Sequence, residues 1–398
     1  MNFTSLVSNG GIFCDGDWIE KKDQDPNGAV RLIQLADIGV CEFKNKSARY
    51  ISEDKGSELN CTYLQKGDIL IARLPEPLGR ACIFPFEGKY ITAVDIAIVR
   101  ILRKDVNPKY VMYMINSPQF RSEIKKYESG TTRKRISRKN LDRIEFDIPP
   151  IPEQERIVAR IEELYSQLDS GVETLNKVKQ QLAVYRQAVL NEAFEDITDS
   201  TAMESLAQMV DPHPSHRTPP EVIGGVPYIG VGDINYDEGI INYSAARKVS
   251  PEILNEHIER YTLHEGDFIM GKIGTIGKPF KVPLPQKYAL SANVILIQPD
   301  SEKVMPDFLF WQFSSPLVTK QLTEGSAATS QPAFGIKKAR LLSIRTCGFD
   351  KQKEIVRDIE ARLSVCDNIG QAVDAALQQA EAMRQSILKQ AFEGGYHK

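Results

Sequence analysis

The feature that most constrains this chain is an internal repeat that extends through most of its 398 residues. The segment Gln154–Val158 recurs as Gln352–Val356, 198 positions later, and Ala193–Glu195 recurs as Ala391–Glu393 in the same register. One register kept over some forty positions is not expected by chance, and self-similarity at a fixed period indicates a repeated architecture. The chain is therefore predicted to hold two copies of a unit of about 200 residues, related by a pseudo-twofold internal repeat.

The offset changes slightly toward the N-terminus. Gly67-Asp68 matches Gly266-Asp267 at an offset of 199, and the Val30–Ile38 pattern matches Val226–Ile234 at 196. Small drifts of this kind indicate short insertions in loops, which tolerate them.

Composition limits the class of protein. The hydrophobic fraction of 42% and the charged fraction of 26% are typical of a globular protein. The sequence has no apolar run close to the ~20 residues that a membrane helix needs, and its first residues lack a signal-peptide pattern. The six cysteines are scattered without a Cys-x-x-Cys pair. We therefore expect a cytoplasmic protein with reduced thiols, no zinc or other metal site and no membrane contact.

The second part of each copy has the pattern of a coiled-coil helix. Apolar residues recur every seven positions along one seam, and a second seam runs beside it. In the first copy the seams are Ile161, Leu168, Leu175, Leu182, Val189 and Ile157, Leu164, Gly171, Val178, Tyr185. In the second copy they are Ile359, Cys366, Val373, Ala380, Ile387 and Ile355, Arg362, Ile369, Ala376, Met383.

Such helices either pack on their own globular parts or pair with each other. The seams are too long and regular for the helix of a small domain, so we favour antiparallel pairing. The residues expected to make helix–helix contacts are Ile157, Ile161, Leu164, Leu168, Leu175, Leu182, Val189, Ile355, Ile359, Val373 and Ile387.

The globular parts show strand patterns first and helix patterns afterwards. Alternating apolar runs such as Asp68–Ala72 and Asn293–Ile297 predict strands, whereas Asn107-Pro108 and Ser117-Pro118 predict capped helix starts. This order favours an α+β fold. The expected organisation is two similar globular domains, 1–150 and 199–348, separated by two long antiparallel helical spacers, 151–198 and 349–396.

Positive charge is concentrated locally although the net charge is −3. The segment from Gly130 to Lys139 holds five cations, with hydroxyl side chains beside them. Arginine can hold a guanine edge with two hydrogen bonds and lysine can neutralise a phosphate, so the loop suits a DNA groove. The alternative is a solvated basic turn. The residues expected to contact DNA here are Thr131, Thr132, Arg133, Lys134, Arg135 and Arg138.

A second pair of cations brackets the turn after the Asp68–Ala72 strand. Arg73 and Arg80 stand at its two ends, and Lys272, Thr275 and Lys278 occupy the matching turn of the second copy. The counterpart of the basic loop, which opens at Gly325, lacks the cation cluster and instead offers Ser330 and Gln331. Glutamine can pair with adenine. We therefore expect two related domains that read two different half-sequences.

Enzyme motifs are weak in this sequence. Pro149-Pro150 is not preceded by the asparagine of an adenine methyltransferase motif, and the Gly271–Lys278 segment does not fit a phosphate-binding loop. Asp300, Glu302 and Lys303 are nearly adjacent, which is a poor nuclease arrangement, and the five histidines show no ligand spacing. No catalytic residue is therefore expected.

Several motifs resemble those of type I restriction–modification specificity subunits. They are the Ile148-Pro-Pro-Ile-Pro-Glu-Gln-Glu-Arg-Ile-Val helix start, the helix ends Arg186–Phe194 and Arg384–Phe392, and the segments Gly67-Asp68-Ile-Leu and Gly130-Thr-x5-Ser137-x-x-Asn140-Leu141. The resemblance covers essentially the whole chain. It departs from the family pattern at Thr-Cys-Gly-Phe after Arg345, which replaces the proline-rich helix start.

The resemblance implies a non-catalytic subunit that reads a bipartite duplex DNA site with two target-recognition domains. It implies two methyltransferase subunits and two restriction subunits as partners, with S-adenosylmethionine, ATP and Mg bound only by those partners. The alternative is a helical adaptor without a DNA role, or a recognition fragment of a methyltransferase–nuclease fusion.

Overall fold

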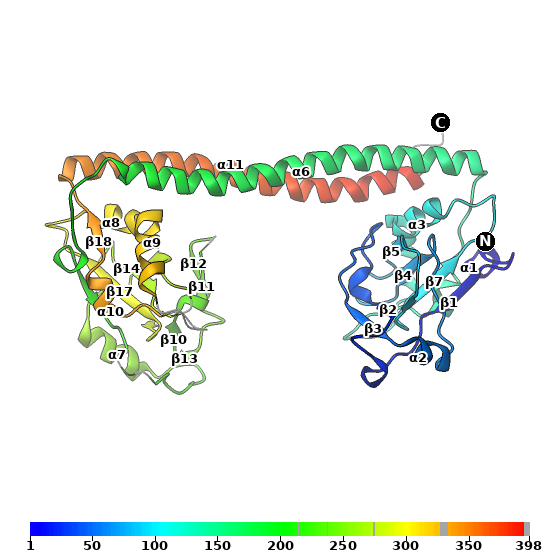
Figure 1. The fold of residues 1–398 in the computed structure, drawn as a ribbon, viewed down its shortest axis with the longest axis horizontal. Helices are drawn as coiled ribbons and strands as arrows, with labels where there is room; N and C mark the ends of the chain where they lie inside the picture. The colour runs from blue at the N-terminus through cyan, green and yellow to red at the C-terminus, as the bar shows by residue number, and fades with distance from the viewer. Residues whose placement is uncertain (214, 216, 237, 274, 327–332, 394–398) are drawn as a thin grey trace. The chain divides into compact units, whose positions relative to one another are not determined.

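A computed structural model of the chain describes all residues except 214, 216, 237, 274, 327–332 and 394–398. The chain forms two compact units, whose elements are labelled in Figure 1. Unit 1 comprises Met1–Leu175 and Ala375–Lys398, and unit 2 comprises Asn176–Asp374. Each unit therefore combines one globular part with segments of both long helices.

Unit 1 contains two small sheets. The larger sheet is antiparallel and has the strand order β1-β7-β4-β5, formed by Ile12–Asp15, Ile96–Arg100, Ile69–Ala72 and Ala81–Ile83. The smaller sheet has the order β3-β2-β6, formed by Arg49–Ile51, Val30–Ile33 and Tyr90–Thr92, with β2 and β6 parallel. Strand β4 is buried at all four positions because Ile69 and Ile71 face one hydrophobic cluster and Leu70 and Ala72 face another. Burial on both faces explains why this strand is apolar throughout.

Unit 2 repeats this topology strand by strand. Its larger sheet has the order β15-β14-β17-β9, formed by Pro279–Lys281, Phe268–Gly271, Val294–Pro299 and Ala207–Val210. Its smaller sheet has the order β13-β10-β16, formed by Lys248–Val249, Val226–Ile229 and Ala289–Leu290, again with one parallel pair. The repeat in the sequence is therefore a repeat of the fold, and the predicted α+β class is confirmed.

Short elements fill the connections of both units. In unit 1 they are α1 (Phe3–Leu6), η1 (Lys21–Asp23), η2 (Leu35–Asp37), α2 (Glu53–Glu58) and α5 (Arg138–Leu141). In unit 2 they are the strand pair β8 (Ser200–Ala202) and β18 (Ser343–Arg345), the hairpin β11 (Ile234–Asn235) and β12 (Ile240–Ile241), and η3 (Met203–Ser205), η4 (Val231–Asp233), α7 (Pro251–Arg260) and α10 (Ile336–Arg340).

A pair of short helices follows the larger sheet in each unit. Helices α3 (Pro108–Asn116) and α4 (Pro118–Lys126) begin as the sequence predicts, with side-chain caps from Asn107 and Ser117 and a proline in the first turn. Helices α8 (Pro306–Ser314) and α9 (Pro316–Gly325) correspond to them in unit 2.

The two long helices are α6 (Ile151–Glu195) and α11 (Phe349–Phe392). A buried glutamine fixes the first turn of each. Gln154 accepts a hydrogen bond from the Asn107 backbone at 2.8 Å and donates to the carbonyls of Asp105 and Pro149. Gln352 does the same with Met305 and Cys347, at 2.8 Å each. The second helix therefore begins in the same way as the first without the proline-rich start.

The helices pair with each other and also complete the cores of the globular parts. In unit 1, Ile157 and Ile161 of α6 and Ile387 of α11 belong to the hydrophobic core that includes α3 and α4. In unit 2, Val189 of α6 and Ile355 and Ile359 of α11 join the core beneath α8. Within each unit, the helices thus pack on the globular part and also pair with each other. Leu164 and Leu168 pack against the first core, Val373 is buried, and Leu175 and Leu182 are half-buried.

The first predicted seam is buried or half-buried throughout both helices, whereas the second is buried or half-buried only in part. Tyr185, Ile369 and Met383 are 44%, 41% and 47% exposed, and Gly171 is also exposed. Several positions four residues after the first seam are also buried or half-buried, among them Tyr165, Val172, Leu363, Leu377 and Ala391. Both flanks of the first seam thus contribute inner residues. The exposed Tyr185 also contacts α11, because its hydroxyl accepts a hydrogen bond from Arg362 at 3.3 Å.

Ion pairs between the helices follow the repeat. In unit 1, Asp169 pairs with Arg384, and in unit 2 the residues 198 positions away, Asp367 and Arg186, form the equivalent pair. Unit 2 also contains Lys179–Asp374 at 2.8 Å and Glu192–Arg362 at 2.9 Å. Residue numbers rise along α6 as they fall along α11, so the helices are antiparallel in unit 2.

Candidate nucleic-acid interface

The basic loop of unit 1 is a short excursion between α4 and α5. Ser129 and Arg135 exchange two backbone hydrogen bonds of 2.9 Å, which close the loop at its base. Gly130 has a φ of +94°, and a Cβ there would lie 2.5 Å from the Arg133 carbonyl oxygen. Only glycine fits this turn without strain. The side chains from Thr131 to Arg135 are all exposed, as a reading loop requires.

The three cations of this loop differ in their surroundings. Lys134 pairs with Glu128 at 2.7 Å and with Glu76 at 3.5 Å, and the bond to Glu128 raises the pKa of the lysine. Among the described residues, no ion pair involves Arg133 or Arg135. Their charges are therefore available to a polyanion, whereas the charge of Lys134 is partly compensated.

The loop lies against the turn that joins β4 to β5. The backbone N–H of Ile136 donates to the Arg73 carbonyl at 3.0 Å, and the Lys134–Glu76 pair crosses between the two segments. The structure thus brings together the two basic segments that the sequence singled out separately.

Arg73 and Arg80 bond to the protein interior rather than extending into solvent. The Arg73 guanidinium donates to the Val94 carbonyl and lies 3.3 Å from the Asp15 carboxylate. Arg80 donates to the carbonyls of Ile38, Pro75 and Leu35 at 2.8, 2.8 and 3.1 Å, and burial lowers its pKa. In this structure these two arginines hold the turn in place, and a direct DNA contact by either stays a prediction.

Arg138 also bonds to the scaffold. Its guanidinium donates to Asp15 at 3.3 Å and to the Phe13 carbonyl at 3.2 Å, and lies 5.6 Å from the centre of the Phe13 ring. The exposed part of the predicted site in unit 1 is therefore the tip of the loop, Thr131 to Arg135.

Unit 2 has the same arrangement with different side chains. The Phe334 N–H donates to the Lys272 carbonyl at 2.8 Å, and Lys272 forms a 3.0 Å ion pair with Asp211 that leaves little of its side chain exposed. Lys278 is exposed and lies 5.3 Å from the centre of the Tyr236 ring, and Thr275 is exposed. Ser330 and Gln331 lie outside the described residues.

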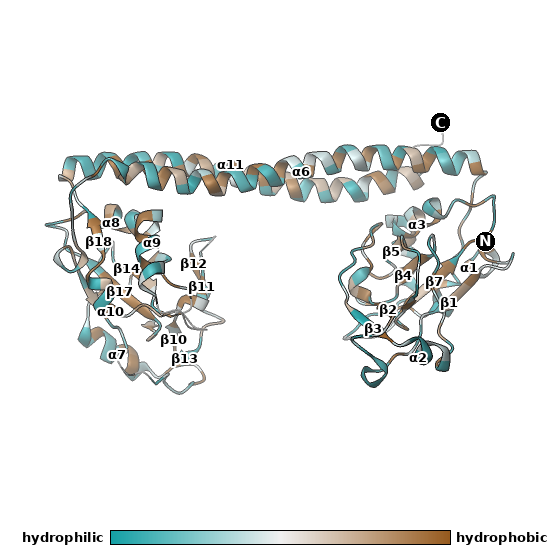
Figure 2. Cartoon of the chain, in the orientation of Figure 1, coloured by the Kyte–Doolittle hydropathy of each residue, from teal (hydrophilic) through white to brown (hydrophobic). Residues whose placement is uncertain are grey.

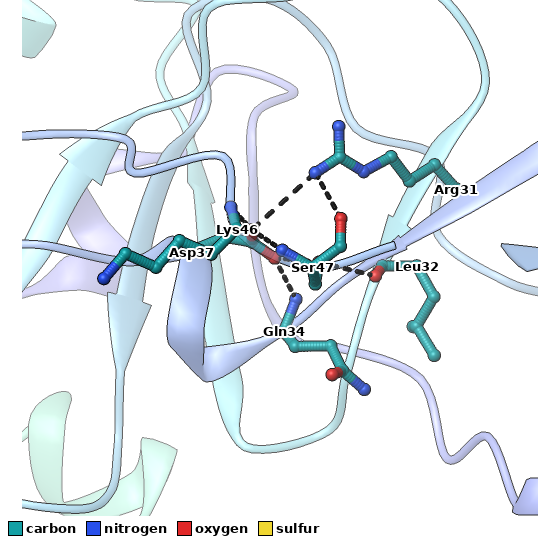
Figure 3. Close-up of polar contacts among 6 residues, drawn as sticks. All are labelled: Arg31, Leu32, Gln34, Asp37, Lys46 and Ser47. Atoms are coloured by element: carbon teal, nitrogen blue, oxygen red, sulfur yellow. Dashed lines mark hydrogen bonds and ion pairs between the residues drawn. The ribbon is translucent and has the colours of Figure 1, made fainter. Parts of the chain in front are cut away.

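The buried carboxylate of Asp37 fixes the segment whose backbone carbonyls accept hydrogen bonds from Arg80. Asp37 accepts hydrogen bonds from the backbone of Gln34, Lys46 and Ser47 at 2.8, 2.6 and 2.7 Å and from the Ser47 hydroxyl, as Figure 3 shows. Arg31 lies 3.7 Å away, and the Asp37 side chain is fully buried. These bonds fix the segment whose carbonyls at positions 35 and 38 accept from Arg80. The sequence offered one signal for this role, because Asp37 recurs as Asp233, which caps its own turn at Gly230.

The other candidate sites gain no support from the geometry. Asp300 and Lys303 form an exposed 2.8 Å ion pair within one turn. Within the described part of the chain, no cluster of His, Cys, Asp or Glu could hold a metal ion, and no helix there has the length and apolarity to cross a membrane. All six cysteines are described and all are unpaired, and burial raises the pKa of Cys41 and Cys82 to about 12.

The known proteins that this chain is similar to come from type I restriction–modification systems. Residues 10–180 match the family described as Type I restriction modification DNA specificity domain. The type I restriction enzyme EcoBI specificity subunit of Escherichia coli is 26% identical over 99% of this chain and 85% of its own length.

Two solved structures share the fold. A chain from a type I R-M system, reported for its complex assembly and conformational transition, superposes with a TM-score of 0.69 at 14% identity, over 97% of this chain and 98% of its own. The HsdS subunit from Thermoanaerobacter tengcongensis gives a TM-score of 0.51 at 14% identity, over 98% of each chain.

Proposed function

We propose that this chain, like the specificity subunits it is similar to, reads the sequence of duplex DNA with its two globular parts and catalyses no reaction itself. The observation that carries this proposal is the exposed loop tip from Thr131 to Arg135, held against a second basic segment by the backbone. Arginine side chains that project from a fixed base can enter a groove and bond guanine edges or phosphates.

The two units would read different halves of a bipartite site. Their loop bases are the same, since Arg73 and Lys272 each accept a backbone bond through their carbonyls and each pair with a carboxylate. Their loop sequences differ. The first unit has five cations from Gly130 to Lys139, whereas the corresponding segment after Gly325 in the second unit has none before Lys337. A shared scaffold with different exposed side chains gives two specificities from one fold.

The partners proposed from the family are methyltransferase and restriction subunits, two of each. S-adenosylmethionine, ATP and Mg would bind to those subunits and not to this chain. For such docking we propose the exposed apolar side chains of unit 2, which include Val184 of α6 and Val365 and Ile369 of α11 and are 41–71% exposed. Figure 2 shows hydrophobic stretches among the hydrophilic ones on both helices. Where such groups form one contiguous patch, they are typical of a protein–protein interface.

We further propose that α6 and α11 set the number of base pairs between the two half-sites. Each helix contributes residues to both units, and each begins from an equivalent buried glutamine. The two long antiparallel spacers expected from the sequence are thus part of the proposed function.

A selection experiment tests the proposal. The full chain, alone and with its methyltransferase subunit, is incubated with a library of duplexes that carry a long randomised segment, and the bound duplexes are sequenced. We expect a motif of two short specified blocks separated by a gap of fixed length. Enrichment of no motif under either condition would refute DNA reading and favour the adaptor alternative. A single continuous motif would refute the assignment of one half-site to each unit.

A further inference from the structure

Asp15 contacts both basic segments of unit 1. It is the last residue of β1, and its two carboxylate oxygens face different segments. Oδ1 is 3.3 Å from Nε of Arg73, which opens the β4–β5 turn, and Oδ2 is 3.3 Å from Nε of Arg138, which follows the basic loop. One side chain of the sheet therefore connects both segments proposed to meet DNA.

The same carboxylate exists in unit 2. Asp211 directly follows β9, the counterpart of β1, and stands 196 positions after Asp15, the offset that also relates Asp37 to Asp233. It forms a 3.0 Å ion pair with Lys272, the counterpart of Arg73. Position 336, which corresponds to Arg138, is an isoleucine. The carboxylate is thus repeated, but it holds one cation in unit 2 and two in unit 1.

These groups lie at the edge of the core rather than within it. The side chains of Asp15, Arg73 and Arg138 are 35%, 15% and 44% exposed. Partly exposed ion pairs add little to overall stability. Asp15 accepts a hydrogen bond from Arg138 and forms an ion pair without a hydrogen bond with Arg73. Such contacts fix direction, and small displacements of a loop base move the loop tip further than the base. The position of this carboxylate therefore affects loop geometry more than folding.

We propose that Asp15 and Asp211 are positioning residues for DNA reading. Asp15 orients Arg73 and Arg138, which flank the basic loop of unit 1, and Asp211 orients Lys272 of unit 2, so that each unit reads one half-site. This inference rests on the proposed function. In unit 1 the Asp15 carboxylate neutralises one of the two guanidinium charges of Arg73 and Arg138. This group of three side chains, called the clamp below, therefore keeps a net positive charge beside the loop. In unit 2 the pair is neutral.

The randomised duplex library also tests this inference. Full-length Asp15→Asn, Asp211→Asn and the control Asp105→Asn are each selected beside the wild type. Asp105 forms an exposed ion pair with Arg103 and faces neither loop. We expect Asp15→Asn to reduce base preference in one half-motif by about tenfold, the effect on an equilibrium of losing one charge-assisted hydrogen bond. Asp211→Asn should weaken only the other half-motif, and the control should weaken neither.

The outcomes separate this inference from the proposed function. If the wild type selects no motif, the proposed function fails. If the wild type selects a bipartite motif and both aspartate variants keep it, or weaken both halves equally, the positioning role is wrong. Because Asp15→Asn could impair folding, Arg138→Gln provides a second variant that removes only the exposed arm of the clamp. Its control is Arg143→Gln, because Arg143 lies just after α5, the short helix that begins at Arg138. Arg138→Gln must affect the same half-motif as Asp15→Asn, and an unaffected half-motif would overturn the proposal.

Discussion

Replacement of Arg133 and Arg135 by glutamine should make DNA binding less sensitive to salt. Both side chains are exposed, and neither has an ion-pair partner among the described residues. A cation that neutralises a phosphate releases a bound counterion from DNA, which makes the affinity depend on salt. Lys134 is left unchanged, because its pairs with Glu128 and Glu76 already compensate much of its charge.

The size of the effect follows from the number of free charges. Each phosphate contact contributes about 0.9 to the slope of log affinity against log salt, so loss of two contacts should lower the slope by about 1.8. Between about 50 and about 200 mM salt, wild-type affinity should therefore fall about 12-fold more than that of the variant. If an arginine bonds a base instead of a phosphate, the change in slope will be smaller and the change in half-site preference larger.

Affinity for the selected duplex is measured by fluorescence anisotropy at four or more salt concentrations, with the full chain and its methyltransferase subunit. The control is Lys351→Gln with Lys353→Gln, which removes the same charge from exposed positions in the first turn of α11. The control should keep the wild-type slope. Equal slopes for the wild type and the Arg133/Arg135 variant, together with unchanged half-site preference, would refute the assignment of the loop to DNA.

Three further predictions concern unit 2, the helix starts and the spacing. Burial lowers the pKa of His257 to about 4, and the His257 imidazole lies 3.2 Å from the His213 ring nitrogen and 3.1 Å from the Tyr261 hydroxyl. An unfolded histidine titrates near 6.5, so the unfolded state takes up the proton first and stability should fall by about 3 kcal/mol as pH drops from about 6.5 to about 4. Gln154→Ala removes three hydrogen bonds of a buried side chain and should cost about 3 kcal/mol by denaturant unfolding, whereas its counterpart Gln352→Ala removes two and should cost about 2 kcal/mol. Insertion of seven residues into both α6 and α11 should lengthen the selected gap by about three base pairs, since the helix rises about 1.5 Å per residue and duplex DNA about 3.4 Å per base pair.

Controls accompany each measurement. His264 is exposed, so replacement by glutamine should leave the acid transition unchanged, whereas His257→Gln should flatten it. An acid profile identical in wild type and His257→Gln would contradict the pH argument. If Gln154→Ala and Gln352→Ala both have unfolding free energies within about 1 kcal/mol of the wild type, the two glutamines do not fix the helix starts. A gap that stays constant after the insertion would show that the helices do not set the spacing.

The sequence alone determined the features that its own patterns record, which are the internal repeat and the local signals of helices. The offset between Gln154 and Gln352 revealed the repeat, and the seven-residue period of Ile161 and its successors located both long helices. Asn107 and Ser117 marked helix starts because caps act within three residues of themselves. Periodicity and capping are local, so a single sequence records them.

The tertiary structure decided which partners each side chain meets. Arg73, Arg80 and Lys272 looked as available for DNA as Arg133, yet they reach carbonyls and carboxylates that are remote in the chain. Tyr185 belonged to an apolar seam, but it is 44% exposed and meets the guanidinium of Arg362 on α11. Asp15 carried no local pattern at all. A cation or carboxylate takes the partner that folding brings within about 3 Å, and that distance depends on contacts between segments far apart in sequence.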